Sequence, residues 1–473
     1  MFKDLTAQIP SEHESVAWLG HLPAHWDTAR GKSLFRREKR EPLDGDGVVT
    51  CFRDGLVTLR ANRRLTGFTE AIQESGYQGI REGDLVIHAM DAFAGAVGVS
   101  DSDGKSSPVY AACTPRGASN VHYYAAVVRE MARTGWIAAL ARGVRERSTD
   151  FRFESFANQV LPVPPYDEQA AIVKYLGHAR ARIDRAIDAK RKLIVLLEEQ
   201  KQAIIHQAVT RGLDPTVSFK DSGLPWLGDI PARWKMIPAR YLFRPVNRRN
   251  RDGTEVKLSV TQARGLVPTD QMLERSMQAS NFDSFQVCDV GDLVLNKYKA
   301  HLGVFWAATL RGLITPNYTV FAPAKGVKSS YYERLFHTPQ YRAIFSSIVY
   351  GVTAGMSPLY NADFNALHCA QPPESEQREI ILFAEKVEQD HARVASRVLY
   401  EIDLLREFRT RLTSDVVTGK FDVRAIAETL PDLAGQSLGV SEDQLFDDSW
   451  NESTLEYVVT AGEQGVAHDP DQP

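Results

Sequence analysis

The feature that most constrains this 473-residue chain is an internal repeat whose two copies lie 208 residues apart. Trp18-Leu19-Gly20 recurs as Trp226-Leu227-Gly228, and Gly83-Asp84-Leu85-Val86 recurs as Gly291-Asp292-Leu293-Val294. Matches with this single offset run from residue 18 to residue 418. One structural unit is therefore duplicated, and the sequence predicts two globular lobes, each followed by a long helix.

The helices are predicted over Glu168 to Arg211 and Glu376 to Thr418, where apolar residues recur in steps of three, four or seven. Such spacing places the apolar residues on one face of a helix. At about 1.5 Å per residue each run would span roughly 60 Å, which is long for a globular helix and requires a partner. We expect the two helices to pack on each other, although each apolar face could instead be buried against its own lobe.

The expected packing positions are apolar and share this spacing. They are Ile172, Leu176, Ile183, Leu193, Leu197 and Ile204 in the first helix, and Ile380, Val387, Val394, Val398, Ile402, Leu405 and Leu412 in the second.

Each lobe has a mixed character that predicts an α+β fold. Asp84 to Ile87 and Asp292 to Leu295 are typical of short buried strands after a Gly-Asp turn, whereas Tyr123 to Ala141 and Tyr331 to Val349 are typical of helices. The expected domains are a first lobe at 1–160, a first helix at 161–211, a second lobe at 212–370, a second helix at 371–420 and an acidic tail at 421–473.

The charge of the chain is unevenly distributed. The formal net charge is −4, but residues 424–473 contain eleven acidic residues and one basic residue, so the remainder is mildly basic. An acidic tail on a basic body permits a nucleic-acid partner without requiring one. The first twenty residues lack the pattern of a secretory signal and no stretch is long and apolar enough for a membrane span, so we expect a cytoplasmic protein without a membrane partner.

No residue pattern predicts a metal, a cofactor or a catalytic site. Cys51, Cys113, Cys288 and Cys369 are scattered without the spacing of a zinc site or a disulfide framework, and we expect buried thiols. The segment at 93–98, FAGAVG, superficially resembles a glycine-rich loop for S-adenosylmethionine, but its second copy keeps one glycine, and a turn between strands is the better interpretation.

Val163-Pro164-Pro165-Tyr166 resembles the Asn/Asp-Pro-Pro-aromatic motif of amino-methyltransferases. In that motif an Asn or Asp side chain accepts a hydrogen bond from the target amine, and Val163 cannot do so. The second copy, Gln371-Pro372-Pro373-Glu374, has no aromatic residue. Both segments are better explained as helix entrances, because proline is favoured just ahead of a first helical turn.

Basic residues in the parts where the two copies diverge are the candidates for DNA contacts, since phosphates require cations and arginine is the commonest reader of guanine. A solvated charged surface remains the alternative. Lys297 and Lys299 alternate as they would along a strand. The candidates are Arg36, Arg37, Lys39, Arg40, Arg142, Arg145 and Arg147 in the first copy, and Arg244, Arg248, Arg249, Arg251, Lys297 and Lys299 in the second.

Taken together, these motifs resemble the specificity subunit of type I restriction-modification systems. The resemblance covers nearly the whole chain: a Leu/Ile-Pro-x-x-Trp element opens each lobe, and Pro-Pro with a Glu-Gln helix start closes it. The helices end in Val209-Thr210-Arg211-Gly212 and Val417-Thr418-Gly419-Lys420. The string at 223–231, GLPWLGDIP, is especially similar to that family.

The resemblance implies two target recognition domains, each reading one half of a bipartite site on double-stranded DNA, held apart by an antiparallel, coiled-coil-like pair of helices. It also implies two methyltransferase subunits as partners, with restriction/translocase subunits in the full complex. Catalysis would belong to those partners. The alternatives are a self-contained DNA adenine methyltransferase and a helical scaffold that does not bind DNA.

Overall fold

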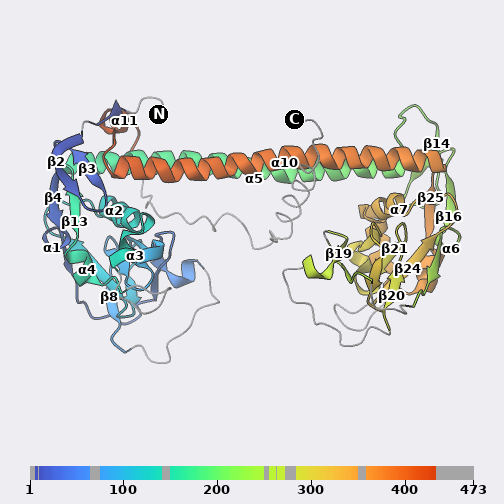
Figure 1. The fold of residues 1–473 in the computed structure, drawn as a ribbon, viewed down its shortest axis with the longest axis horizontal. Helices are drawn as coiled ribbons and strands as arrows, with labels where there is room; N and C mark the ends of the chain where they lie inside the picture. Colours follow the sequence, from blue (N-terminus) through green and yellow to red (C-terminus); the bar gives the residue numbers. More distant parts are fainter. Residues whose placement is uncertain are drawn as a thin grey trace. The chain divides into compact units, whose positions relative to one another are not determined.

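The computed structural model describes residues 6–8, 10–63, 75–140, 150–249, 255–262, 264–271, 284–349 and 358–432 (Figure 1). These residues form two compact units. One contains the described residues up to Lys190 and from Glu401 onward, and the other extends from Arg191 to Tyr400. Each unit therefore contains one lobe and one half of each long helix.

The first lobe is built around an antiparallel sheet with the strand order β10-β9-β12-β5. Its strands are β5 (Phe35–Arg37), β9 (Leu85–His88), β10 (Val97–Val99) and β12 (Tyr110–Pro115). Two-stranded ribbons surround it: β2 (Pro10–Val16) with β3 (Gly20–Pro23), β4 (Asp27–Arg30) with β13 (Val160–Val163), β6 (Val49–Cys51) with β7 (Val57–Leu59), and β8 (Gln78–Ile80) with β11 (Gly104–Ser106). The helices are α1 (Gly31–Leu34), α2 (Val121–Arg133), α3 (Trp136–Leu140) and α4 (Phe153–Ala157), with the 3-10 turns η1 (Arg60–Asn62) and η2 (Ala92–Ala94).

The second lobe repeats this plan with the strand order β17-β24-β21-β22. Its strands are β17 (Phe243–Val246), β21 (Leu293–Asn296), β22 (Phe305–Ala307) and β24 (Tyr318–Pro323). Its ribbons are β14 (Phe219–Asp221) with β15 (Asp229–Pro231), β16 (Lys235–Pro238) with β25 (His368–Gln371), β18 (Leu258–Val260) with β19 (Leu266–Pro268), and β20 (Gln286–Cys288) with β23 (Gly312–Ile314). The helices are α6 (Ala239–Leu242), α7 (Ser329–Phe336), α8 (Pro339–Ile348) and α9 (Asn361–Ala366), with η3 (Thr269–Gln271) and η4 (Lys297–Leu302).

The lobes keep the 208-residue offset in their strand register and their cores. Leu85 pairs with Cys113 in the first lobe, and Leu293 pairs with Phe321 in the second. Each lobe also has a small core cluster of its own. The cluster of the first lobe contains Val86, and that of the second contains the equivalent Val294. These correspondences confirm the duplicated α+β fold that the sequence predicts.

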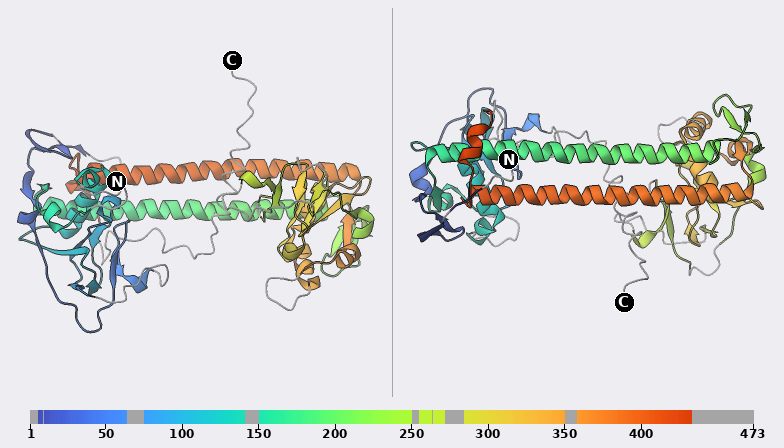
Figure 2. Two further views of the ribbon diagram at one scale, coloured as in Figure 1. Left: turned by 60° about the horizontal axis from the view of Figure 1, so that its bottom comes forward. Right: turned by 90° about the horizontal axis from the view of Figure 1, so that it is seen from above.

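The two long helices are α5 (Tyr166–Arg211) and α10 (Glu374–Val417), which lie side by side (Figures 1 and 2). In the first unit Asp184 is 2.7 Å from Arg409 and Lys190 is 2.5 Å from Glu401, so residue numbers rise on one helix as they fall on the other. The helices are therefore antiparallel. Among the described residues, no helix is both long and apolar enough to cross a membrane.

Most of the positions predicted for helix packing are buried or partly buried, and two are exposed. Ile172, Leu176, Ile183, Ile380, Val398, Ile402 and Leu412 are buried, and Leu197, Ile204, Val387 and Leu405 are partly buried. Leu193 and Val394 are exposed, at 42% and 43%, and the neighbouring Ile194 and Ala395 are buried instead. The buried residues Ile187, Ile194 and Lys201 follow one seven-residue spacing, so the predicted apolar line was one residue out of register there.

The start and end of the described chain meet in the first unit. The short strand β1 (Thr6–Ala7) pairs with β26 (Phe421–Asp422), which follows α10. The Gln8 side chain donates to Glu168 at 2.9 Å, and its backbone N–H donates to Lys420 at 3.0 Å. After β26 the chain forms the helix α11 (Arg424–Thr429).

Candidate nucleic-acid interface

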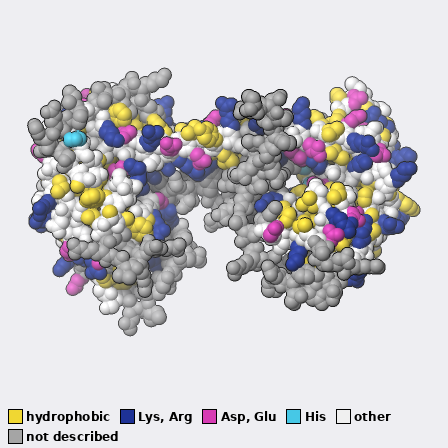
Figure 3. Space-filling view, in the orientation of Figure 1, with side chains coloured by type: hydrophobic (Ala, Val, Ile, Leu, Met, Phe, Trp, Pro, Cys, Tyr) yellow, Lys and Arg dark blue, Asp and Glu magenta, His cyan; other side chains and the backbone are white. Residues whose placement is uncertain are grey.

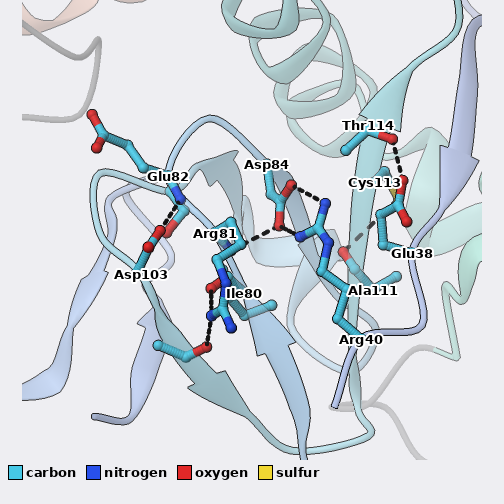
Figure 4. A network of polar contacts seen from close by, with 12 residues as sticks. Glu38, Arg40, Ile80, Arg81, Glu82, Asp84, Asp103, Ala111, Cys113 and Thr114 are labelled. Carbon is cyan, nitrogen blue, oxygen red and sulfur yellow. Dashed lines mark hydrogen bonds and ion pairs between the residues drawn. The ribbon is translucent and has the colours of Figure 1, made fainter. Parts of the chain in front are cut away.

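Arg40 and Arg248, two of the DNA-contact candidates, each bind a buried carboxylate within their own lobe. The Arg40 guanidinium donates to Asp84 at 2.5 and 3.1 Å, and Arg248 donates to Asp292 at 2.5 and 3.3 Å (Figure 4 shows the first pair). These hydrogen bonds raise the pKa of Arg40 and of Arg248. Asp84 and Asp292 also accept a backbone N–H, from Arg81 and Asp289 respectively, and so close the Gly-Asp turn.

Both arginines therefore have a structural role that recurs at the 208-residue offset. Each carboxylate is almost fully buried at the start of a central strand, where an unpaired charge would be costly. Charge counting could not separate these arginines from surface arginines, but the recurrence of an Arg with an Asp 44 residues later in both copies was a usable signal.

The other candidates of the first cluster lie on or beside strand β5. Arg36 is exposed and donates from Nε to Glu38 at 2.8 Å and to Thr114 at 2.9 Å, and Arg37 forms a long ion pair with Glu154 at 3.8 Å. Lys39 is exposed. Thr114 also donates to Glu38 at 2.5 Å and lowers the pKa of that carboxyl (Figure 4). This end of β5 therefore presents two exposed cations, Arg36 and Lys39.

Arg244 and Arg249 are exposed in the second lobe. Arg244 lies on β17, where its backbone pairs with Ala322, and Arg249 forms an isolated backbone bridge with Gln286. Positions 36 and 244 are thus exposed arginines at equivalent places in the two sheets, because β5 and β17 are equivalent edge strands. Arg142, Arg145, Arg147 and Arg251 lie outside the described residues.

Lys297 and Lys299 do not alternate along a strand, and that prediction was wrong. Strand β21 ends at Asn296, and the chain then turns into η4 (Lys297–Leu302), a 3-10 segment that is kinked at Lys299. The Asn296 side chain accepts the backbone N–H of Tyr298 at 3.1 Å and so starts the turn. Lys299 is exposed, whereas Lys297 is half-buried and donates to the carbonyl oxygen of Pro316 at 3.1 Å.

The charges at two further equivalent positions are reversed between the lobes. The first lobe has Arg81 and Asp103, and the second has Asp289 and Arg311, which form an ion pair. In the first lobe Asp103 accepts the backbone N–H of Glu82 at 2.8 Å, and Arg81 binds Asp46 at 3.2 Å (Figure 4 shows Arg81 and Asp103). Equivalent positions of the two lobes therefore carry side chains of opposite charge.

The Glu-Gln pair at each helix start attaches the helix to its lobe, a role that the sequence did not reveal. Gln169 accepts the backbone N–H of Asn120 at 2.8 Å and donates to Pro164 at 2.8 Å. Gln377 makes the equivalent contacts with Lys328 and Pro372 at 2.9 Å each. All four polar side chains of these two pairs are buried. Their recurrence after Pro-Pro was visible in the sequence but indicated a helix start alone.

The glutamates of these pairs bind the tryptophan-bearing segment that opens each lobe. Glu168 is 2.7 Å from His25, and Glu376 accepts from both Arg233 and Trp234 at 2.9 Å. The helix-entrance interpretation of the Pro-Pro segments is confirmed, because α5 begins at Tyr166 and α10 at Glu374. The turn interpretation of the 93–98 segment is also confirmed, since it forms the end of η2, a left-handed Gly95 and the start of β10.

The described cysteines are buried free thiols, as expected. Within the described ranges, no group of three or more His, Cys, Asp or Glu side chains is placed to hold a metal ion. Cations are spread over both lobes on the face shown in Figure 3.

Comparison with solved structures identifies the architecture. No protein-family model matches the sequence. A chain from a structure describing complex assembly and conformational transition of the type I R-M system has a TM-score of 0.58 and 14% identity, and the match covers 84% of this chain and 99% of that chain. The HsdS subunit from Thermoanaerobacter tengcongensis (TM-score 0.48, 15% identity, 84% and 98% covered) and the type I restriction-modification S subunit from M. genitalium (0.31, 12%, 91% and 100%) also match. The fold of this chain is therefore the fold of a protein of the type I restriction-modification systems.

Proposed function

We propose that this chain is the DNA-recognition and assembly subunit of a type I restriction-modification complex and is not itself an enzyme. The observation that carries the proposal is the duplicated α+β lobe on an antiparallel helix pair, a fold shared over most of the chain with a protein of such a system. A duplicated reader suits a bipartite target on double-stranded DNA, with each lobe reading one half.

Exposed cations on or just after the equivalent edge strands β5 and β17 support DNA as the partner of the lobes. Arg36 and Lys39 belong to the first lobe, and Arg244 and Arg249 to the second. Arg40 and Arg248 are excluded from the proposed contact set because carboxylates hold them. Phosphate contacts by such side chains would position a lobe, while base-specific contacts would come from the segments in which the two copies differ.

Exposed apolar residues on the long helices support docking of two methyltransferase subunits. Leu196 on α5 is 60% exposed and Leu404 on α10 is 45% exposed, and these residues occupy equivalent positions in the two copies. Hydrophobic side chains are visible on the helices in Figure 3. Two equivalent apolar positions, one in each half of the chain, suit two copies of one partner. Restriction/translocase subunits would join the complete complex.

A self-contained adenine methyltransferase is the competing function. It would require a hydrogen-bond acceptor at Val163, which is an apolar residue at the end of strand β13. The structural scaffold is the third possibility, and it would bind no DNA.

Purified full-length chain, incubated with labelled S-adenosylmethionine and DNA, should transfer no methyl groups. The same chain with its methyltransferase subunits should methylate adenines, and mapping them in the host genome should return two half-sites separated by a fixed spacer. Transfer by the chain alone would favour the methyltransferase alternative, and absence of DNA binding by the assembled complex would favour the scaffold.

Exchange of one lobe tests the modular reading of the target. Because β4 pairs with β13, the exchanged segment should be residues 27–163. The exchange should change one half-site and leave the other unaltered, because each lobe has its own core. A change in both half-sites would contradict independent reading.

A further inference from the structure

The loop that follows strand β9 in the first lobe, and the loop that follows β21 in the second, each expose one large apolar side chain at the equivalent position. We call these the tip loops, His88–Ala96 in the first lobe and Asn296–Val304 in the second. Met90 is 47% exposed and Tyr298 is 40% exposed, and they are separated by the repeat offset of 208 residues. The two residues occupy equivalent positions and both expose apolar side chains, but Met90 is aliphatic and Tyr298 is aromatic.

Both tip loops start with a contact made by the side chain of the residue that ends the preceding strand. The residue that ends the central strand accepts a backbone N–H from the loop: His88 Nδ1 accepts from Asp91 at 3.1 Å, and Asn296 Oδ1 accepts from Tyr298 at 3.1 Å. The backbone N–H of that same strand-ending residue donates across the loop, from His88 to Ala96 and from Asn296 to Val304, at 3.1 Å in each case. The base of each loop is therefore closed in the same way.

One further backbone hydrogen bond holds each loop, and it recurs at the repeat offset. The carbonyl oxygens of Ala89 and Lys297 accept the backbone N–H of Phe151 and Leu359, at 3.0 and 2.9 Å. Each loop then reverses at a glycine with a left-handed backbone, Gly95 or Gly303, which lets the next strand begin directly. These contacts fix the backbone of each loop and so fix the position of its exposed apolar side chain.

The charge of the residues beside the exposed apolar side chain differs between the two loops, and it is basic beside Tyr298. In the second lobe Tyr298 stands between Lys297 and the exposed Lys299, whereas the first lobe has Asp91, paired with Arg53 at 2.9 Å, at the position equivalent to Lys299. An exposed ring beside an exposed lysine is suited to a nucleic-acid surface, where the ring stacks on a base and the lysine meets a phosphate.

We infer that Tyr298 and Met90 are wedge residues that enter the base stack of double-stranded DNA, one beside each half-site. Apolar side chains that enter between base steps unstack them and bend the duplex, so such a residue adds to recognition through the deformability of a base step. The inference rests on the proposed function, because it requires the lobes to bind DNA. Tyr298 contributes stacking on a base, and Met90 contributes an aliphatic wedge.

The test uses the full-length chain and a target duplex defined by the methylated half-sites, with 2-aminopurine replacing one base at a time. Unstacking raises the fluorescence of this base analogue, so the wild-type chain should give a rise at one step beside each half-site. Tyr298→Ala should abolish the rise beside one half-site and weaken binding about tenfold. Tyr298→Phe should keep the rise, and Met90→Ala should abolish the rise beside the other half-site.

Two matched variants separate stacking from charge and from folding. Lys299→Ala should lower the slope of log affinity against log salt by about one while keeping the fluorescence rise, whereas Tyr298→Ala should leave the slope unchanged. Tyr241→Ala, which removes a tyrosine that is 64% exposed elsewhere in the same lobe, should change neither measurement. Equal thermal unfolding of these variants is expected, because the replaced side chains are exposed.

Failure of the inference and failure of the proposed function give different results. A wild-type chain that does not distinguish target from scrambled DNA overturns the proposed function. A wild-type chain that does distinguish them, with Tyr298→Ala unchanged in affinity and fluorescence, overturns the wedge alone. A third outcome also overturns the wedge. In that outcome the wild type gives no fluorescence rise, and Tyr298→Ala loses affinity and shows a shallower salt slope. The tip loop would then contact phosphates.

Discussion

The Tyr331 hydroxyl donates a 2.8 Å hydrogen bond to the carbonyl oxygen of Val209, in the last turn of α5. Tyr123, its equivalent in the first lobe, donates to Val417 at 3.2 Å, in the last turn of α10. Carbonyl groups in the last turn of a helix have no partner within that helix. Each lobe thus caps the end of the helix that precedes it in the repeat and, through its Glu-Gln pair, holds the start of the helix that follows.

Tyr331→Phe should lower the free energy of unfolding by about 1–2 kcal/mol, because the substitution leaves the Val209 carbonyl without its buried partner. Urea unfolding of the full-length chain measures the change. Tyr241→Phe is the matched control, since Tyr241 is exposed, and it should have no effect. Equal loss in the two variants would contradict a capping role for Tyr331.

Arg248→Ala should destabilise the second lobe by about 2–3 kcal/mol, because it leaves the buried Asp292 carboxylate without its ion pair. The neighbouring Arg249→Ala should not alter stability but should lower the salt dependence of DNA binding by about one phosphate contact. Denaturant unfolding and binding titrations at several salt concentrations distinguish the two effects. The assignment fails if Arg249→Ala destabilises the chain as much as Arg248→Ala does.

The second lobe should show two opposing pH effects from Glu333 and His337 on and after α7. Burial raises the pKa of Glu333 to about 7 from an ordinary value of 4.5, so the folded state favours the neutral acid and stability falls as pH rises from about 4.5 to 7. Burial lowers the pKa of His337 to about 4 from 6.5, so stability falls as pH drops from about 6.5 to 4. In the wild type the two effects oppose each other between those limits.

Single substitutions separate these effects. Glu333→Gln should leave stability that rises by about 2 kcal/mol from pH 4 to 6.5 and is flat above, and His337→Gln should leave stability that falls by a similar amount from pH 4.5 to 7. Chemical unfolding at half-unit pH intervals provides the curves. Identical pH profiles for the wild type and both variants would show that neither side chain controls stability.

Leu196→Glu should remove one methyltransferase subunit from the complex, and Leu196→Glu with Leu404→Glu should remove both. A charge on an exposed apolar contact blocks desolvation at an interface without disturbing the fold. Native mass spectrometry counts the subunits. Leu43→Glu replaces a leucine that is 63% exposed in the first lobe and should keep the full complex. Retention of both subunits by the double variant would place the docking surface elsewhere.

The fold could be predicted from the sequence because each pattern that indicated a helix or a strand in one half could be compared with the equivalent positions in the other half. Long uninterrupted helices after Pro-Pro and short strands after Gly-Asp turns depend on local rules, and the two copies satisfy them at the same positions. The seam between the helices was less predictable. A shift of one residue, from Leu193 to Ile194, decides which side chain is buried, and both are aliphatic.

The candidate site was predictable in composition but not in detail. Arg36 and Arg40 lie four residues apart in one basic run, yet one is exposed and the other binds the buried Asp84. That difference depends on a carboxylate 44 residues away in the sequence, which no local pattern reports. The 3-10 turn at Lys297 was missed because the preceding strand ends earlier than the alternation of the two lysines indicated.

The pairing of β1 with β26 has an evolutionary consequence. In the second lobe, a continuous peptide of residues 212–218 joins the end of α5 to β14, whereas in the first lobe a non-covalent strand pair stands where that peptide would be. The contacts between the two lobes and their helices therefore do not dictate which half is encoded first. A rearranged chain that began within residues 212–218 and joined the end of β26 to β1 would keep the same strand pairs, so it should adopt the same fold with the two halves in the opposite order.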